Sequence, residues 1–228
     1  MSDFISPEAF AQLIDHTLLK ADASADGVEA LSREAIAHRF FGVCVNGCRV
    51  ELAHSLVAEA GIKVVAVVGF PLGAMEADAK RFETEAAIDS GAHEIDVVLN
   101  IGKLKDGNTG YVARELRDVV ESADERPVKV ILETSLLSLS EKKLACEIAV
   151  DAGAAFVKTS TGILGTGATV EDVLLMRATV GAAIGVKASG GIRSLNQALA
   201  LIDAGANRLG VSASVALLKE LRAKTAHL

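Results

Sequence analysis

The sequence predicts an α/β protein in which eight strand–helix units close into a barrel, and a repeated phrase is the first observation behind this prediction. An acidic residue, a small residue and a glycine recur at Gly61, Gly91, Gly153 and Gly205, each time after a helical pattern and before a strand. Glycine suits this junction because the residue after a helix often adopts positive φ. The 30 residues from Gly61 to Gly91 hold one unit, and the longer gaps of 62 and 52 residues hold two units each.

The second observation is that strand and helix patterns alternate along the whole chain through short connections, which implies parallel pairing. The expected strands are Leu13–Asp15, Gly42–Val45, Val64–Val68, Glu94–Leu99, Val128–Glu133, Ala155–Lys158, Gly185–Ala188 and Arg208–Val211. The expected helices span about 24–38, 49–60, 75–90, 111–124, 140–152, 169–180, 194–204 and 213–222.

Chain length is the third observation, because eight such units in 228 residues favour a closed (β/α)8 TIM barrel over an open doubly wound sheet. No linker or low-complexity stretch divides residues 1–228, so we expect a single domain. A short N-terminal helix over Phe4–Ala11 is expected to cover the N-terminal end of the barrel.

Composition excludes several classes of function. Lys and Arg number 23 against 30 Asp and Glu, a net charge of −7, which disfavours nucleic-acid and membrane-surface partners. No apolar run approaches the ~18 residues of a membrane-spanning helix, and the start M-S-D-F-I-S-P-E has no export-signal pattern. The odd set of Cys44, Cys48 and Cys146 makes a disulfide framework improbable. We therefore expect a cytoplasmic protein with a small-molecule partner.

Charged residues in strands identify the candidate catalytic groups, because catalytic groups of barrels lie at the C-terminal ends of strands. In E-I-D-V-V-L-N, alternation places Ile95, Val97 and Leu99 on one face and Asp96 on the other, which points into the barrel. An edge-strand charge facing water is the alternative, but a closed barrel has no edge.

Lys158 and Lys187, on the sixth and seventh expected strands, are two further charged residues that could point into the barrel. Neighbouring strands lie about 4.8 Å apart, so two inward lysines could bring their ammonium groups together. At ~5 Å and an effective dielectric of ~20 their repulsion is roughly 3 kcal/mol, which would lower one pKa by about two units. A neutral lysine can attack a carbonyl to form a Schiff base. The alternative is that each lysine extends past its strand end into solvent.

Glycines and hydroxyls after the last strands indicate a phosphate site. Gly190 and Gly191 follow the seventh strand, and Gly210 and Ser212 follow the eighth, where barrels often bind phosphate through backbone N–H groups and helix N-termini. Gly162, in the loop after Lys158, is expected to add to this pocket. Turn formation alone would also explain such glycines.

Metal binding is a weaker hypothesis. The five histidines show no ligand spacing, and Cys44 with Cys48 is better explained by core packing near the second strand. Glu133 ends the fifth expected strand near the mouth, and spacing alone gives it no role.

Five motifs then carry a resemblance to a known family: D-H-T-L-L-K, F-G-V-C-V-N, E-I-D-V-V-L-N-I-G, F-V-K-T-S-T-G and K-A-S-G-G-I-R. In this order, across nearly the whole chain, they resemble deoxyribose-phosphate aldolases. The resemblance implies a (β/α)8 barrel that reversibly cleaves 2-deoxy-D-ribose 5-phosphate to D-glyceraldehyde 3-phosphate and acetaldehyde, in deoxynucleoside breakdown, without metal or organic cofactor. It implies that Lys158 forms the Schiff base, that Lys187 perturbs it and that Asp96 takes part in proton transfer.

Two departures from the family pattern matter. Some members carry a phosphate-contacting lysine directly after S-T-G, where this chain has Ile163, and some end in a tyrosine, whereas the only tyrosine here is Tyr111. The resemblance also implies the phosphate loops at Gly190–Gly191 and at Gly210 with Ser212.

Two rival functions are another lysine-dependent barrel lyase or transferase and a silent phosphosugar sensor. The apolar content permits a homodimer without requiring one.

Overall fold

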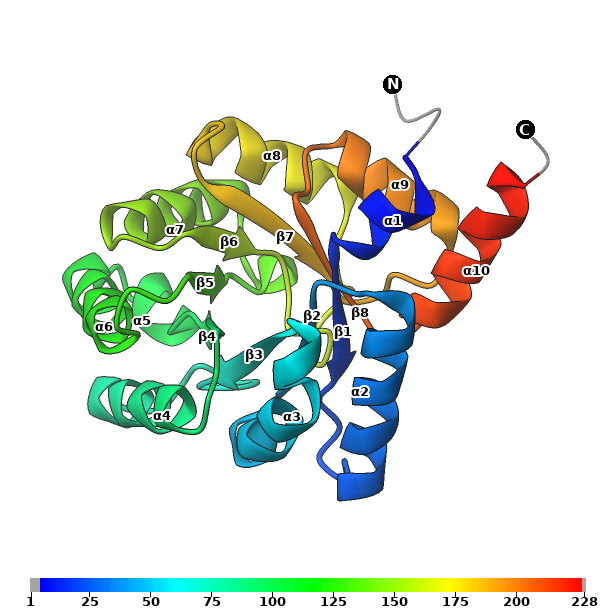
Figure 1. Cartoon of the computed structure of the whole chain (residues 1–228). Helices are drawn as coiled ribbons and strands as arrows, with labels where there is room; N and C mark the ends of the chain where they lie inside the picture. Colours follow the sequence, from blue (N-terminus) through cyan, green and yellow to red (C-terminus); the bar gives the residue numbers. More distant parts are fainter. Residues whose placement is uncertain (1–4, 227–228) are drawn as a thin grey trace.

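The computed structural model describes residues 5–226 and confirms the closed barrel (Figure 1). Eight parallel strands pair in chain order, and β8 pairs with β1 through Ile14 and Leu209 to close the ring. The helices surround the strands, which is the (β/α)8 TIM-barrel arrangement that the repeated strand–helix pattern predicts.

The strands lie close to their expected positions. They are β1 Ile14–Leu18, β2 Gly42–Asn46, β3 Lys63–Val68, β4 Glu94–Val98, β5 Val128–Ile131, β6 Phe156–Lys158, β7 Gly185–Ser189 and β8 Arg208–Val211. The α-helices are α1 Pro7–Ala11, α2 Ala25–His38, α3 Val50–Val57, α4 Ala77–Asp89, α5 Ile101–Lys105, α6 Thr109–Ser122, α7 Leu139–Asp151, α8 Val170–Val180, α9 Leu195–Asp203 and α10 Ser214–Thr225.

Two elements differ from the expectation. The short helix α5 was not predicted; Asn100 begins it, and its side chain accepts a hydrogen bond from Lys103 N at 3.2 Å. Strand β5 ends at Ile131 rather than at Glu133, because Glu133 adopts the left-handed conformation with φ +54°, which a continuous strand does not accommodate.

The glycines of the repeated phrase lie where the chain leaves a helix. Gly61, Gly91, Gly153 and Gly205 all have positive φ. At Gly91 the close approach of a neighbour adds a second constraint, because a Cβ atom there would lie 2.6 Å from the His54 ring. Conformation and space together therefore explain the repeat.

Strand alternation separates two environments. Ile95, Val97 and Leu99 are fully buried in the apolar core between the barrel and its helices. Asp96 is also fully buried but faces the barrel interior, where it meets charged side chains from other strands. The predicted orientation of Asp96 is confirmed.

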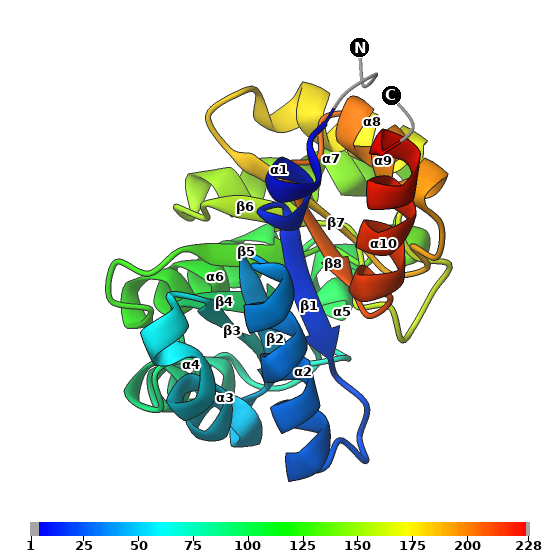
Figure 2. The ribbon, with the colours of Figure 1, turned by 45° about the vertical axis from the view of Figure 1, so that its right-hand side comes forward.

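The closing strand β1 is fixed from outside by two helices (Figure 2). The buried His16 ring contacts Glu34 of α2 through Nε2 at 2.8 Å and Ser214 of α10 through Nδ1 at 3.0 Å. Helix α1 precedes β1 and lies beside α10, and its Phe10 side chain is buried. The expected N-terminal helix begins later than predicted, at Pro7 with Ser6 as its N-cap, and Phe4 lies outside the described residues.

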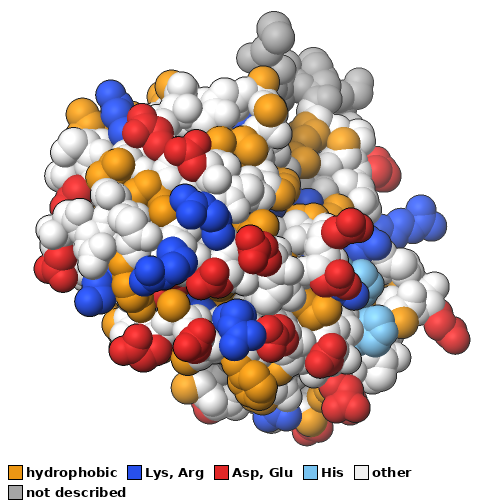
Figure 3. All heavy atoms as spheres, turned by 90° about the vertical axis from the view of Figure 1, so that its left-hand side faces the viewer, with side chains coloured by type: hydrophobic (Ala, Val, Ile, Leu, Met, Phe, Trp, Pro, Cys, Tyr) orange, Lys and Arg blue, Asp and Glu red, His pale blue; other side chains and the backbone are white. Residues whose placement is uncertain are grey.

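The outer helix faces carry interspersed positive and negative side chains, as Figure 3 shows for the side formed by α4 to α7. Exposed pairs here include Arg81 with Glu85 and Lys105 with Glu141. Among the helices of residues 5–226, none combines the length and the apolar character that crossing a membrane requires.

Candidate active site

Seven charged side chains from six strands meet inside the barrel. All are at most 7 % exposed, and they are Asp15 of β1, Glu94 and Asp96 of β4, Lys129 of β5, Lys158 of β6, Lys187 of β7 and Arg208 of β8. The register places Lys158 directly beside Lys187 and Asp96 directly beside Lys129. The barrel closure therefore brings together residues that are far apart in the sequence.

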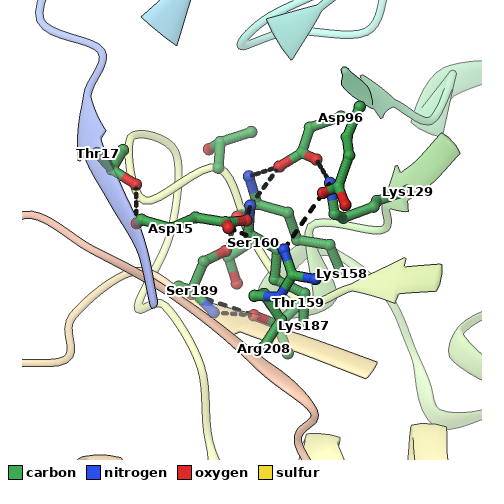
Figure 4. A network of polar contacts seen from close by, with 12 residues as sticks. Asp15, Thr17, Asp96, Lys129, Lys158, Thr159, Ser160, Lys187, Ser189 and Arg208 are labelled. Carbon is green, nitrogen blue, oxygen red and sulfur yellow. Dashed lines mark hydrogen bonds and ion pairs between the residues drawn. The ribbon is translucent and has the colours of Figure 1, made fainter. Parts of the chain in front are cut away.

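Asp96 is the centre of this network (Figure 4). Its Oδ2 atom accepts hydrogen bonds from Lys158 Nζ at 2.8 Å and from Lys187 Nζ at 2.7 Å, and its Oδ1 atom accepts one from Lys129 Nζ at 2.8 Å. Both candidate lysines therefore point inward to one carboxylate oxygen. This geometry contradicts the alternative in which either lysine extends into solvent.

Asp15 and Glu94 complete the network. Lys187 also donates to Asp15 Oδ2, and Arg208 bridges Asp15 and Glu94 at 2.9 Å and 3.3 Å. Lys129 donates to Glu94 Oε2 at 2.6 Å. Every carboxylate thus contacts at least two cationic groups.

The charges fix the protonation of the central groups. Burial raises the pKa of the Asp96 carboxyl, but Lys129, Lys158 and Lys187 lower it by more, so it lies well below the ordinary 3.8. Burial lowers the pKa of Lys187, but Asp15 and Asp96 raise it by more, and it ends above the ordinary 10.5. Asp96 is therefore a carboxylate and Lys187 an ammonium.

This arrangement differs from the electrostatic explanation predicted for Lys158. The sequence predicts two mutually repelling lysines, whereas the structure interposes a carboxylate between them. Three carboxylates in the network face three other cations, Lys129, Lys187 and Arg208. The charges of these six groups thus balance one another without Lys158, which contacts the same Asp96 oxygen as Lys187.

A cavity of about 300 Å³ opens above Lys158 at the C-terminal ends of the strands. It is lined by the C-terminal ends of β1, β6, β7 and β8 and by the loops that follow them. All five residues predicted to bind phosphate line it together with Lys158: Gly162, Gly190, Gly191, Gly210 and Ser212. The structure therefore places the candidate nucleophile and the candidate phosphate loops in one cavity.

Close backbone packing explains the glycines of this cavity. A Cβ atom on Gly190, whose φ is +84°, would lie 3.0 Å from the Cα atoms of Gly162 and Gly167. A Cβ atom on Gly210 would lie 2.9 Å from Ser189 Cβ and 3.2 Å from Lys187 Cε. These two positions of the cavity lining therefore leave too little room for a side chain.

Glu133, which the sequence left without a role, supports the loop after β6. Its fully buried side chain accepts hydrogen bonds from Thr161 N at 3.0 Å and from Thr161 Oγ1 at 2.5 Å. Thr161 Oγ1 in turn accepts from Ile163 N at 3.1 Å. Glu133 therefore holds the loop that contains Gly162.

Sequence reasoning missed Asp15, Glu94, Lys129 and Arg208 as members of the network. Each is an ionisable residue within a strand, the same signal that identified Asp96.

The prediction that both Cys44 and Cys48 pack in the core is half wrong: Cys44 on β2 is buried, whereas Cys48 lies in the turn after β2 and is exposed. Within residues 5–226, no group of three or more His, Cys, Asp or Glu side chains is arranged to hold a metal ion.

A (β/α)8 barrel with a buried lysine–carboxylate network below an open, glycine-walled mouth is an arrangement typical of the aldolase class of barrel enzymes. Comparison with known families agrees: residues 9–219 match the sequence model of the DeoC/LacD family aldolases. The chain belongs to this family.

Its relatives carry one name. A deoxyribose-phosphate aldolase of Bacillus licheniformis is 55 % identical over 93 % of this chain and 96 % of that protein, and one of Alkaliphilus oremlandii is 54 % identical over 95 % and 98 %. Among solved structures, the deoxyribose phosphate aldolase of Aeropyrum pernix, described as a unique tetramer, superposes with a TM-score of 0.90 at 34 % identity, covering 96 % of this chain and 93 % of that one.

Proposed function

We propose that this protein is a class I deoxyribose-phosphate aldolase, which reversibly cleaves 2-deoxy-D-ribose 5-phosphate to acetaldehyde and D-glyceraldehyde 3-phosphate. The family and the relatives above 50 % identity support the reaction. The observation that carries the mechanism is the position of Lys158, which lines the mouth cavity while its Nζ contacts Asp96.

Substrate binding uses the two ends of the cavity. The phosphate binds to the N–H groups around Gly190, Gly191 and Gly210, with the Ser212 hydroxyl and Gly162 completing the cradle. The open-chain aldehyde then extends down to Lys158. Anchoring one end of the sugar in this way orients the reacting carbonyl.

Schiff-base formation begins when the neutral Lys158 amine attacks the C1 aldehyde. Loss of water gives a cationic iminium ion, which restores a positive charge next to the Asp96 carboxylate. The ammonium of Lys187 contacts the same Asp96 oxygen that the Lys158 amine contacts. Lys187 thus acts as an electrostatic partner of Lys158.

Cleavage requires that the C3 hydroxyl lose its proton. The electrons of that O–H bond then form the carbonyl of glyceraldehyde 3-phosphate, and the C2–C3 electron pair moves toward the iminium nitrogen to give an enamine. Asp96 is a weak base because three lysines stabilise its ionised form. Its part in the proton transfer is therefore indirect: a bridging water or lysine takes the proton from the C3 hydroxyl, and Asp96 acts through that group. Protonation of the enamine at C2 and addition of water release acetaldehyde and free Lys158.

The two rival functions are less well supported. A non-catalytic phosphosugar sensor would require the glycine-lined phosphate site. Binding alone would not require a lysine in the cavity whose amine contacts a buried carboxylate. A lysine-dependent enzyme with another phosphosugar would share this site, but the relatives named above are all deoxyribose-phosphate aldolases.

The compartment and assembly are further parts of the proposal. We place the protein in the cytoplasm, where the three unpaired thiols of Cys44, Cys48 and Cys146 suit a reducing environment. We also propose self-association as a homodimer, since the exposed side chains of Leu72, Phe82 and Leu139 offer apolar surface that association could bury.

The activity is tested by measuring release of glyceraldehyde 3-phosphate from 2-deoxyribose 5-phosphate in a coupled assay. We expect turnover by the native protein and a loss of roughly 10³-fold or more in Lys158→Ala, because this variant lacks the amine that forms the Schiff base. Lys143→Ala is the matched control: Lys143 is an exposed lysine of α7 that forms no ion pair in the described part of the chain. Native-like turnover by Lys158→Ala would contradict the mechanism, and no turnover by the native protein would contradict the function.

A further inference from the structure

The mouth cavity is positively charged although the whole chain carries a net charge of −7. Its charged lining residues, among those that the structure describes, are Lys20, Lys158 and Arg193, and no Asp or Glu lines it. Lys158 is committed to the reacting carbonyl under the proposed function. Lys20 and Arg193 remain as the cations near the cavity opening, where the phosphate cradle lies.

Lys20 reaches this cavity because the barrel is closed. It follows β1, which pairs with β8, so the loop after β1 borders the end of β8 at Gly210 and the residue Ser212 just after it. The cavity lining includes the continuous segment from Thr17 to Lys20 on one side and the segment from Gly210 to Ser212 next to it. Residues nearly 200 positions apart in the chain thus share one wall.

The Lys20 ammonium has no competing partner within residues 5–226. The side chain is exposed, and it forms no ion pair and donates no hydrogen bond in this part of the chain. Most cations of the barrel interior, by contrast, are held between carboxylates. Lys20 is therefore available to an anionic ligand without breaking an existing contact.

The loop after β6 also lines the cavity, and its lining residues carry no charged side chain. Ile163 lines it directly after Gly162 and is 56 % exposed, so this loop supplies an apolar side chain beside the cradle. A phosphate monoester carries about −1.5 to −2 charges near neutral pH. Backbone N–H groups alone give partial charges, whereas an ammonium gives a full one.

We propose that Lys20 is a specificity-determining residue that contacts the substrate phosphate from the β1 side of the cavity and selects phosphorylated over unphosphorylated sugars. This inference rests on the proposed function and adds a residue to it. Lys20 acts only on the distant end of the substrate, so it affects binding and not the chemistry at Lys158. Its contribution depends on charge and is screened by salt.

The test compares steady-state kinetics of Lys20→Ala and native protein on 2-deoxyribose 5-phosphate and on 2-deoxyribose. We expect KM for the phosphorylated sugar to rise roughly fivefold to tenfold, the size of one partly exposed charge-assisted contact. We expect kcat for that substrate, and kcat/KM for 2-deoxyribose, to stay unchanged. Lys20→Arg should retain most of the preference, and Lys20→Glu should weaken it beyond the alanine variant.

A second readout uses inorganic phosphate as the probe. Phosphate should inhibit cleavage of 2-deoxyribose competitively, with a Ki that rises in Lys20→Ala and stays native in the control Lys143→Ala. Equal changes for both sugars, or an unchanged KM and Ki in Lys20→Ala, would overturn the role of Lys20. The two possible failures can be told apart by the activity of the native protein. If the role of Lys20 is wrong, the native protein still cleaves 2-deoxyribose 5-phosphate; if the proposed function is wrong, it does not.

Discussion

At the scale of single residues, the candidate active site is built around one carboxylate that three lysines contact. Asp96 is fully buried and contacts Lys129, Lys158 and Lys187, an arrangement that would be costly if any charge lacked a partner. The same contacts keep Asp96 ionised and Lys187 protonated. The proposed chemistry and the stability of the barrel interior therefore involve the same side chains.

We expect the protein to lose stability in acid through this residue. The pKa of Asp96 lies well below 3.8 in the folded state, so the unfolded chain binds protons at a higher pH than the folded chain does. The stabilisation from Asp96 is complete above about pH 4 and is lost as the pH falls toward its folded pKa. Urea denaturation between pH 6 and pH 3 measures this as a fall in the free energy of unfolding.

Two variants separate Asp96 from the other carboxylates. Asp96→Asn should be less stable at pH 6 and should show a shallower pH dependence. Asp22→Asn removes an exposed carboxylate that forms no ion pair within residues 5–226, and it should keep the native slope. An Asp96→Asn protein whose stability falls as steeply as the native one would show that Asp96 is not the group responsible.

At the scale of elements, the strand that carries Asp96 is held from outside by a buried pair between α4 and α6. Lys80 Nζ lies 2.9 Å from Glu115 Oε2 and donates to the Val98 carbonyl of β4 at 2.8 Å, with both side chains fully buried. Burial lowers the pKa of Lys80 by more than the Glu115 carboxylate raises it. Burial likewise raises the pKa of Glu115 by more than the Lys80 ammonium lowers it. Desolvation therefore outweighs the attraction in this pair.

The pair predicts a non-additive pattern of stability. Glu115→Leu alone should cost about 3–5 kcal/mol, because it leaves a buried ammonium without its carboxylate. The double variant Lys80→Met with Glu115→Leu should cost less than this single variant, since no charge remains buried. Chemical denaturation of the two variants and of Lys80→Met gives the coupling. A double variant at least as destabilised as Glu115→Leu would mean that the ion pair itself holds the strand.

At the scale of the whole molecule, the sequence predicted the barrel because each unit contains its own signal. The glycines after the helices, such as Gly91 and Gly153, mark the repeat, and strand alternation gave the inward direction of Asp96. Short local features were harder to predict. Helix α5 has five residues, and Glu133 leaves β5 through a left-handed backbone that a non-glycine residue rarely adopts.

The site was predictable only in part, because its partners come from distant segments. Lys158 and Lys187 stand on neighbouring strands, and a register of paired strands was enough to place them together. The bridge from Arg208 to Asp15 and Glu94 joins β8 to β1 and β4, and it exists only once the ring closes. Lys20 likewise reaches the phosphate side through closure, so no local pattern marks it.

The covalent role of Lys158 is tested most directly by trapping the Schiff base. The protein is incubated with 2-deoxyribose 5-phosphate and sodium borohydride, digested, and mapped by mass spectrometry. We predict a reduced substrate or acetaldehyde adduct on Lys158, together with irreversible loss of activity that depends on substrate. An active preparation that is inactivated with Lys158 unmodified, or that carries its adduct on another lysine, would contradict the account.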